Sequence, residues 1–375
     1  MKTAQYIWKE TAWTSEHEQE DLNPQLCLLF GTRATFEAGN IYFEKLKEQF
    51  PESQIVQCTS AGNIYDEQLL DDVIVATCLE FETTQIEAKL FQIQEENGQI
   101  LGNQIAQTMN REDLSYLLLL STTGVNAGQL LAGVNEVYQG KVSVSGGVAG
   151  DNVAFEKTLI GLNEDLGESR VVAVGFYGEN LVTKHGTQGG WDPFGPKREV
   201  TKAEGNVIYE LDQKPILDLY KEYLGPKAAE LPSSALYFPL AVETEDSYIV
   251  RGVQDVDEEK HALILFGDVK EGDIIQLMRA NFDRVIEGAA NSASQSIDSK
   301  LGEPQFALLI SCVGRRIVLD QLVEEELSEV RDALGKHTTI TGFYSYSELS
   351  PLVEAGKCQL HNQTMTITSF YEKTN

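Results

Sequence analysis

The fold class is indicated by three neighbouring stretches, YLLLLS (116–121), AGQLLAGVNEVY (127–138) and KVSVSGGVA (141–149). The first is a continuous apolar run of strand length, the second has apolar residues at helical spacing, and the third is a strand that enters a glycine turn. Further strands are expected at 158–162 and 171–177. This order of strand, helix and strands predicts a sheet covered by helices.

The same plan is found nearer the N-terminus. A buried strand is expected at LCLLF (26–30), a helix at 36–50 that ends at Pro51, and a strand and glycine turn at QIVQCTSAGNIY (54–65). Strands at 73–81 and 86–92 follow. The turns CTSAGN (58–63) and GGVAGD (146–151) each lie about 30 residues after the first strand of their copy, which indicates an internal repeat.

A third copy is predicted near the C-terminus. FALLIS (306–311) is typical of a buried strand. An acidic helix is expected at 319–334, and a strand that leads into the turn GFYSYSE is expected at 338–344. A last strand is expected at 365–371. The stretch 185–212, which mixes aromatic and turn residues, is expected to be a loop.

A domain boundary is predicted after the helix at 215–225, which Gly225 and Pro226 end. We expect an N-terminal arm over 1–24, an N-terminal domain over 25–226 and a C-terminal domain over 227–375. The fold class is α/β in the wider sense of a mixed α+β protein. Its two related domains are built from repeated strand-helix-strand-strand units and face each other, with their sheets covered by helices.

Charge and cysteine content exclude several classes of partner. The chain of 375 residues has 58 acidic and 29 basic residues, a formal net charge of -29. Such a surface repels nucleic acid and anionic membranes. The N-terminus lacks a secretory signal and apolar runs are too short to span a bilayer, so a cytoplasmic location is expected. The five cysteines lie far apart without a CxxC motif, and we expect reduced thiols, no metal and no cofactor.

The glycine turn SGGVAGD (145–151) does not have the spacing of a nucleotide-binding loop, because GxxxxGK[ST] and GxGxxG are both absent. One interpretation is a tight turn that only glycine permits. The other is a ligand site: Gly146 and Gly147 would let a small molecule approach the backbone, and Asp151 would bind its ammonium group.

Two cysteines are candidate nucleophiles. Cys58, followed by Thr59 and Ser60, and Cys312 each come at the end of a buried strand. Catalysis requires a base and a lowered thiol pKa. At Cys312, Arg315 and Arg316 lie close in sequence and would favour the thiolate, and His361 would supply the base. The alternative is that both thiols simply pack in the core.

The last third of the chain has a second group of candidates. Arg315 and Arg316 would hold a carboxylate through a bidentate fork, or would form structural salt bridges. Tyr344, Tyr346 and Glu348 alternate onto one face of the expected strand end. With His361 they would orient a small polar molecule in a pocket, or would cap strands and satisfy buried backbone groups.

Five segments together resemble the FIST family of paired N- and C-terminal sensory domains, which occur in bacterial and eukaryotic signal transduction proteins. They are CTSAGNIY (58–65), SGGVAGD (145–151), GWDPFGPKREVTKAEGNVIYELDQKPILDLYKEYLG (190–225), LLISCVGRR (308–316), and GFYSYSELSP (342–351) with LHNQTMTIT (360–368). The resemblance implies an intracellular small-ligand sensor, with amino acids as proposed ligands. Ser347 departs from the pattern, which commonly has glycine there.

Three hypotheses follow. In the first, a non-catalytic sensor binds an amino acid or similar polar metabolite between its domains, with Arg315 on the carboxylate and Glu348 or Asp151 on the ammonium. It would signal in trans through a kinase or another output protein, because no residues are left for an output module. The second is a cysteine-dependent enzyme of acyl or thiol chemistry, and the third an adaptor without a ligand. The predicted ligand-binding residues are Cys58, Thr59, Ser60, Gly146, Gly147, Asp151, Cys312, Arg315, Arg316, Tyr344, Tyr346, Glu348 and His361.

Overall fold

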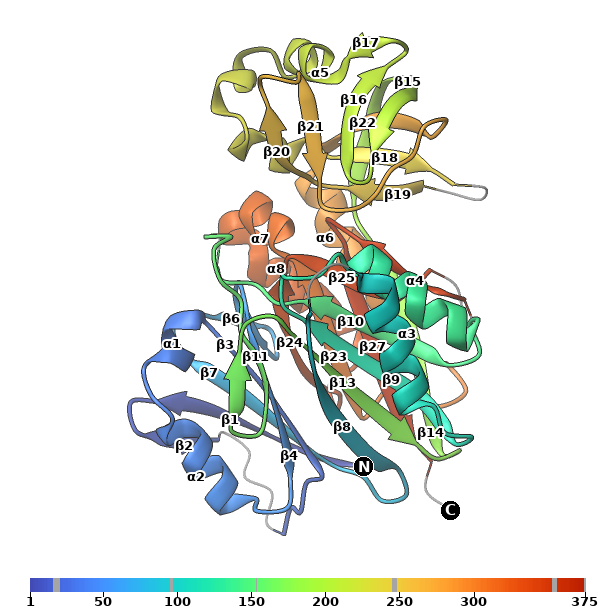
Figure 1. The fold of residues 1–375 in the computed structure, drawn as a ribbon. Helices are drawn as coiled ribbons and strands as arrows, with labels where there is room; N and C mark the ends of the chain where they lie inside the picture. Colours follow the sequence, from blue (N-terminus) through green and yellow to red (C-terminus); the bar gives the residue numbers. More distant parts are fainter. Residues whose placement is uncertain (16–20, 95–96, 153, 245–247, 353–355, 374–375) are drawn as a thin grey trace.

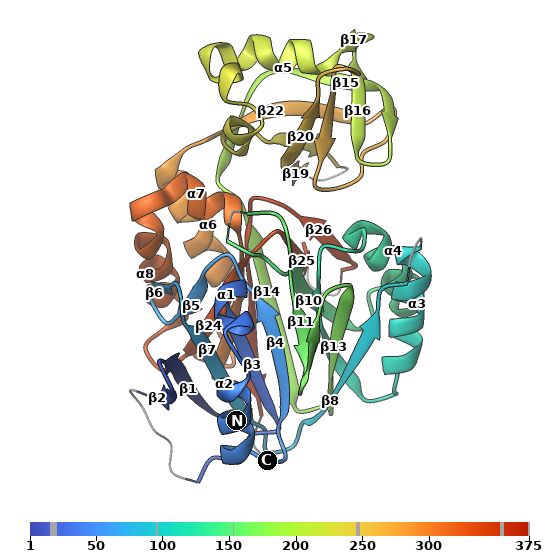
Figure 2. The same cartoon turned by 60° about the vertical axis from the view of Figure 1, so that its left-hand side comes forward.

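The computed structural model describes residues 1–15, 21–94, 97–152, 154–244, 248–352 and 356–373. Three sheets form a lower body, and a fourth sheet forms a smaller upper body that stands on one end of it (Figure 1). Both chain termini lie at the opposite end of the lower body, as the turned view also shows (Figure 2). The mixed α+β class expected from the sequence is confirmed.

Each lower sheet is built around one predicted copy of the repeat. In spatial order, the first sheet is β12 (Asp165–Gly167), β11 (Ile160–Leu162), β4 (Gln54–Thr59), β3 (Leu26–Gly31), β7 (Ile74–Glu80), β1 (Lys2–Lys9) and β2 (Ala12–Thr14). The second is β26 (Cys358–His361), β25 (Ser347–Pro351), β10 (Ser143–Val148), β9 (Leu114–Ser121), β13 (Arg170–Tyr177) and β8 (Gln85–Gln92). The third is β14 (Leu181–Gln188), β27 (Met365–Glu372), β23 (Phe306–Cys312), β24 (Thr339–Ser345), β5 (Asn63–Tyr65) and β6 (Gln68–Leu70).

The three sheets share one topology. In each, two parallel strands are joined through helices, as in β3 and β4, β9 and β10, and β23 and β24. An antiparallel strand then pairs beside the first of them: β7, β13 or β27. The repeat predicted from the sequence is therefore a repeat of topology, and its three copies share one body.

The copies also exchange strands in a cycle. The hairpin after β4 leaves its own sheet, and β5 pairs with β24 of the third sheet. The strand after β24, β25, pairs with β10 of the second sheet, and the strand after β10, β11, pairs with β4 of the first. Each copy therefore completes the sheet of another, and the turns that follow β4, β10 and β24 are drawn together.

Continuous apolar strands are explained by burial on both faces. Alternate side chains of β3, β9 and β23 point inward to one central cluster, which includes Leu28, Leu118 and Leu308. The intervening residues point outward and pack against helices, Leu29 in one cluster and Leu119 with Leu309 in another. The first sheet is covered by α1 (Arg33–Glu37) and α2 (Ile41–Gln49), the second by α3 (Gly98–Met109) and α4 (Ala127–Tyr138), and the third by α6 (Phe282–Gln295), α7 (Val313–Leu319) and α8 (Val323–Leu334).

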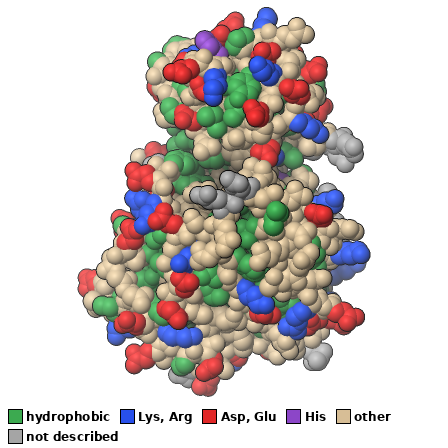
Figure 3. Space-filling view, in the orientation of Figure 1, with side chains coloured by type: hydrophobic (Ala, Val, Ile, Leu, Met, Phe, Trp, Pro, Cys, Tyr) green, Lys and Arg blue, Asp and Glu red, His purple; other side chains and the backbone are tan. Residues whose placement is uncertain are grey.

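The upper body is an insertion between β14 and α6 of the third copy. Its sheet has the order β19 (Tyr248–Arg251), β18 (Leu240–Glu243), β22 (Ile274–Ala280), β15 (Trp191–Glu204), β16 (Val207–Leu211), β21 (Ala262–Leu265) and β20 (Val253–Asp257), with β17 (Lys214–Pro215) paired to β16. The helix α5 (Ile216–Leu224) and the 3-10 turns Gly225–Glu230 and Ser233–Tyr237 accompany this sheet, and a third 3-10 turn, Asp320–Leu322, links α7 to α8. The surface view shows the molecule narrowing between the two bodies (Figure 3).

Two sequence expectations differ from this arrangement. The expected loop at 185–212 instead forms the second half of β14 together with β15 and β16, because its residues continue the third sheet and then start the upper sheet. The segment 1–24, expected to be an arm or a lead-in strand outside the core, includes β1 and β2. β1 pairs with β7, and its Ala4 and Tyr6 belong to a core cluster. The boundary predicted at 226/227 lies within the upper body and stays a prediction.

Candidate functional site

The three predicted turns meet at one end of the lower body, below the upper body. Backbone hydrogen bonds link them in a cycle: Ala61 N donates to Tyr344 O (2.8 Å), Gly150 N to Thr59 O (3.1 Å), and Tyr346 N to Val148 O (3.0 Å). The sequence landmarks that suggested a repeat thus contact each other directly. The candidate residues on these turns are therefore close together at this end of the lower body.

The glycines of the second turn are required by this packing. A side chain on Gly146 would place its Cβ 1.7 Å from the carbonyl oxygen of Leu119, and one on Gly147 would lie 2.8 Å from Ile310 Cγ2. Gly146 also has a φ of +158°. Both positions are buried, so the glycines bring protein backbone together here rather than opening it to solvent.

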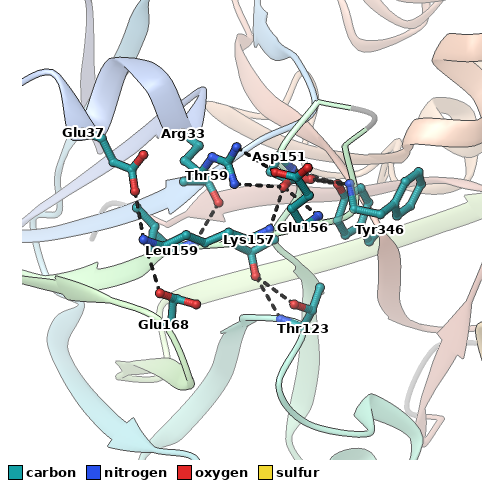
Figure 4. A network of polar contacts seen from close by, with 12 residues as sticks. Arg33, Glu37, Thr59, Thr123, Asp151, Glu156, Lys157, Leu159, Glu168 and Tyr346 are labelled. Atoms are coloured by element: carbon teal, nitrogen blue, oxygen red, sulfur yellow. Dashed lines mark hydrogen bonds and ion pairs between the residues drawn. The ribbon is translucent and has the colours of Figure 1, made fainter.

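Asp151 anchors the loop that follows the second turn (Figure 4). Its buried carboxylate accepts backbone hydrogen bonds from Phe155 (2.9 Å), Glu156 (3.0 Å) and Lys157 (2.7 Å), and it also accepts the hydroxyl of Tyr346. Arg33 Nη1 approaches Asp151 Oδ2 at 3.7 Å. The carboxylate is therefore engaged by protein groups and holds Phe155 against the third turn.

Arg315 forms a buried ion pair. Its Nε and Nη2 donate to Glu326 Oε2 at 3.0 and 2.5 Å, and Tyr344 donates its hydroxyl to Glu326 Oε1 (2.9 Å). The remaining guanidinium contacts are the carbonyl oxygens of Gly189, Val285 and Gln363. Arg315 has no exposed surface, and the network joins α7, α8 and β24.

Arg316, the neighbouring cation, points to the surface. It holds the carboxylate of Asp71 with a bidentate fork, Nη1 to Oδ1 at 3.0 Å and Nη2 to Oδ2 at 2.6 Å. It also donates to the carbonyl oxygen of Ala61 in the first turn. Arg316 thus links α7 to the exchanged hairpin of the first copy.

Both candidate nucleophiles are buried thiols. Burial raises the pKa of Cys58, and burial together with the nearby Glu348 carboxyl raises the pKa of Cys312. A nucleophilic cysteine requires the opposite shift. Thr59 Oγ1 accepts the backbone N–H of Leu159 (2.9 Å), so it acts in strand pairing, and Ser60 Oγ lies 2.5 Å from Asn63 Oδ1.

Glu348 and His361 lie on the paired strands β25 and β26. Burial raises the pKa of Glu348 to about 8, although Ser345 Oγ (2.8 Å) and Thr364 Oγ1 (3.0 Å) donate to its carboxyl group. Burial lowers the pKa of His361 to about 4, and its Nε2 lies 2.9 Å from the Ser350 carbonyl oxygen. Both side chains contact protein groups in the interior.

A cleft of about 550 Å³ opens between the two bodies, beside the third turn. The lower body contributes Tyr346, Phe155 and the segment before α4, and the upper body contributes residues near Phe266. Tyr346 is the predicted residue that lines it. The polar lining includes Thr123, Asn126, Asn206, Gln254, Asp268 and Ser347.

An aromatic stack forms one wall of this cleft and crosses between the bodies. The rings of Phe155 and Tyr346 are stacked at 4.3 Å, and Phe155 lies 5.9 Å from Phe266 of the upper body. Phe155 is 43% exposed, which is unusual for a ring of its size. A flat or apolar part of a ligand would pack against it.

Asp268 supplies the negative charge of the cleft. Its Oδ1 accepts a hydrogen bond from Asn126 Nδ2 (3.1 Å), across the gap between the bodies. Neither Lys nor Arg is among the described lining residues. Arg251, outside this lining, donates its Nε–H to the backbone carbonyl of Asp268 (3.4 Å), and its charge interacts with the Asp268 carboxylate. The charge on the lining itself is negative and so favours a group with positive charge over a ligand that is only anionic.

Most residues of the cleft were not predicted from the sequence. Asn126 had a local signal, since it precedes an apolar helical run, and its side chain caps α4 by accepting from Gln129 N. Phe155 lies in a loop of the lower body, and Phe266 and Asp268 lie in one loop of the upper body, more than 100 residues later in the chain. Only the insertion of the upper body brings them together.

Comparison with known proteins identifies the family. The model of the FIST N domain matches residues 25–214, and that of the FIST C domain matches residues 217–351. The chain belongs to the FIST family. FIST domains are sensory domains assigned to small-ligand recognition in signal transduction. The sequence resemblance to this family is thus confirmed.

Relatives of this FIST protein include two uncharacterized proteins. One, from Mycobacterium tuberculosis, is 24% identical over 389 residues and covers 99% of this chain and 98% of its own. The other, from Methanocaldococcus jannaschii, is 26% identical over 201 residues, covering 49% of this chain and 38% of its own. Among solved structures, a cyanuric acid hydrolase from A. caulinodans matches at 8% identity and a TM-score of 0.33, over 94% of this chain and 91% of that one.

None of the described helices has the length and apolar character that crossing a bilayer requires. Groups of three or more His, Cys, Asp or Glu side chains placed to bind a metal are likewise absent from this part of the chain.

Proposed function

We propose that this FIST protein senses a small ligand with a positively charged group, and that the ligand binds in the cleft between the upper and lower bodies. The observation that carries the proposal is the position of Asp268, a carboxylate on the upper body that faces an aromatic wall of the lower body. The proposal moves the ammonium partner from Asp151 or Glu348 to Asp268. The carboxyl groups of Asp151 and Glu348 are buried and accept several hydrogen bonds from protein groups, whereas Asp268 is exposed in the cleft.

The chemistry of the cleft suits an amino acid or a related amine. Asp268 would bind the ammonium group with a charge-assisted hydrogen bond. The amides of Asn206 and Gln254 would contact a polar group, and the face of Phe155 would pack against a side chain. Pockets that bind small organic ligands have volumes of about 300–1,000 Å³. The cleft, at about 550 Å³, is within this range and is large enough for an amino acid or a related amine.

The position of the cleft also suggests how binding is signalled. Its walls belong to two bodies, and a ligand that contacts both walls stabilises the arrangement in which they are close. A partner in trans, such as a kinase, would read this change on the surface of the upper body. We expect this to happen in the cytoplasm, which fractionation of cells that make the protein would test.

A ligand screen tests the proposal. The purified chain would be unfolded in denaturant, dialysed to remove bound molecules, and refolded. It would then be screened by thermal shift against the twenty L-amino acids, simple amines and simple carboxylates. We expect the melting temperature to rise with at least one amine or amino acid and with none of the simple carboxylates. A rise with carboxylates alone, or with no compound of the panel, would contradict the proposal.

A further inference from the structure

Two buried thiols face each other in the first sheet. Cys27 on β3 and Cys78 on β7 are directly opposite in the antiparallel register, and their Sγ atoms are 2.6 Å apart. Opposite residues in such a pair have Cα atoms about 4.5–5.5 Å apart, within the range of about 4.4–6.8 Å that a disulfide spans. A bond between the two sulfurs therefore requires no movement of the strands.

The other three cysteines are placed differently. Cys58 belongs to the central cluster, whereas Cys27 and Cys78 lie on the opposite face of the first sheet, beneath α1 and α2. Among the described cysteines, this pair alone is close enough for its thiols to contact.

We propose that Cys27 and Cys78 form a reversible disulfide that crosslinks β3 to β7. The bond forms by reaction with a low-molecular-weight disulfide such as oxidised glutathione. The Cys27 thiolate attacks one sulfur of the small disulfide and releases one small thiol. The Cys78 thiolate then attacks the mixed disulfide and releases the second. Two protein thiols and one small disulfide give one protein disulfide and two small thiols, so atoms and electrons balance.

The surroundings of the pair determine when this happens. Both thiols are fully buried under an apolar layer that includes Phe36, Tyr42 and Leu46, and burial raises the pKa of Cys78. Exchange is therefore slow in the closed protein and fast while α1 and α2 are detached, during folding or local opening.

The crosslink would close a chain segment that includes the first turn. The residues between Cys27 and Cys78 include β4, the first turn at 58–63 and the exchanged strand β5, which pairs with the third sheet. Closing this loop lowers the entropy of the unfolded chain and so stabilises the first sheet and its exchanged hairpin.

Refolding with mapping of thiols tests the proposal. The chain would be refolded from urea in a glutathione buffer that is either reducing or oxidising, quenched with acid, and analysed by titration of thiols in denaturant and by non-reducing peptide mass spectrometry. We expect the thiol count to fall from five to three in the oxidising buffer and a Cys27–Cys78 peptide pair two hydrogens lighter than its parts. The urea midpoint should be higher for the oxidised chain.

Matched variants separate the pair from general oxidation. Cys358→Ala removes a thiol outside the pair, and its count should fall from four to two. Cys27→Ala and Cys78→Ala should each keep four thiols, and circular dichroism would show that both are folded. Five free thiols in the oxidised wild type, or a crosslink between any other two cysteines, would overturn the proposal.

Discussion

The hydroxyl of Tyr346 donates a hydrogen bond to the buried carboxylate of Asp151, which lies 195 residues earlier in the chain. The two residues belong to the third and second copies of the repeat, and the same hydroxyl accepts the backbone N–H of Phe155 (3.0 Å). This one contact therefore joins two turns and fixes the aromatic wall of the cleft.

Tyr346→Phe tests the strength of that contact. The ring stack with Phe155 would remain, but Asp151 would lose one of its donors in the interior. Hydrogen bonds to charged groups contribute about 1.5–3 kcal/mol, and we expect a loss of this size in the free energy of unfolding, measured with urea. Tyr209→Phe, on the upper sheet, is the control. Equal stability of the two variants would show that the contact is unimportant.

Arg315→Met tests the structural role of the ion pair with Glu326. Removing one partner of a buried pair leaves the other charge uncompensated, which costs about 3–5 kcal/mol of stability. The neighbouring Arg316→Met breaks a pair that is partly exposed, and such pairs contribute about 0–1 kcal/mol. If urea unfolding gave the same loss for both variants, or a greater one for Arg316, this reading of α7 would be wrong.

Glu348 makes stability depend on pH. Its pKa is about 8 in the folded chain and ordinarily 4.5, so the folded state keeps a proton that the unfolded state releases. Its contribution is fully present below 4.5 and is lost as the pH rises through about 8. Glu348→Gln has no ionisable group at this position, so its free energy of unfolding should fall less steeply with pH than that of the wild type. The two slopes should differ by at most about 1.4 kcal/mol per pH unit.

The pH range of that experiment can be chosen so that the buried histidines do not contribute to the change in stability. His185 and His361 have pKa values lowered to about 4 from 6.5, so their effect on stability appears as the pH falls below 6.5. Urea unfolding between pH 6.5 and 8 therefore reports on Glu348. Parallel curves for the wild type and the Gln variant in this range would contradict the assignment.

Much of the lower body could be predicted from the sequence because its strands are buried on both faces. Runs such as 26–30 and 117–120 are apolar throughout, and α4 has the expected bounds of 127–138. The helix α3 was not predicted, because Ile100, an apolar residue, lies on its exposed face and interrupts the polar stripe. The cyclic exchange of strands also has no local signal, since β5 and β11 are only three residues long.

The site was predicted less well than the fold, and the reason is physical. The sequence showed that Asp151, Arg315 and Glu348 are unusual polar residues, but burial and pairing with distant groups decide what such residues do. Arg315 meets Glu326 on α8, and Asp151 meets Tyr346, through tertiary contacts alone. Asp268 has no local signal in the sequence, because only the fold of the inserted body places it at the cleft.

Alkylation tests the cysteine-dependent alternative. Because burial raises the pKa of Cys58 and of Cys312, both thiols should react slowly with iodoacetamide at neutral pH in the folded chain and quickly in urea. Peptide mass spectrometry would follow each site over time. Rapid modification of either thiol in the folded chain would instead support a nucleophilic role.

The central claim is that Asp268 binds the charged group of the ligand. The most direct measurement is calorimetric titration of the wild type, Asp268→Asn and Asp218→Asn with the strongest ligand of the screen. Asp218 is a carboxylate of the upper body outside the cleft. Loss of a charge-assisted hydrogen bond, about 1.5–3 kcal/mol, predicts affinity about 10- to 100-fold weaker for Asp268→Asn and unchanged for Asp218→Asn. Equal affinities for all three proteins would contradict the account.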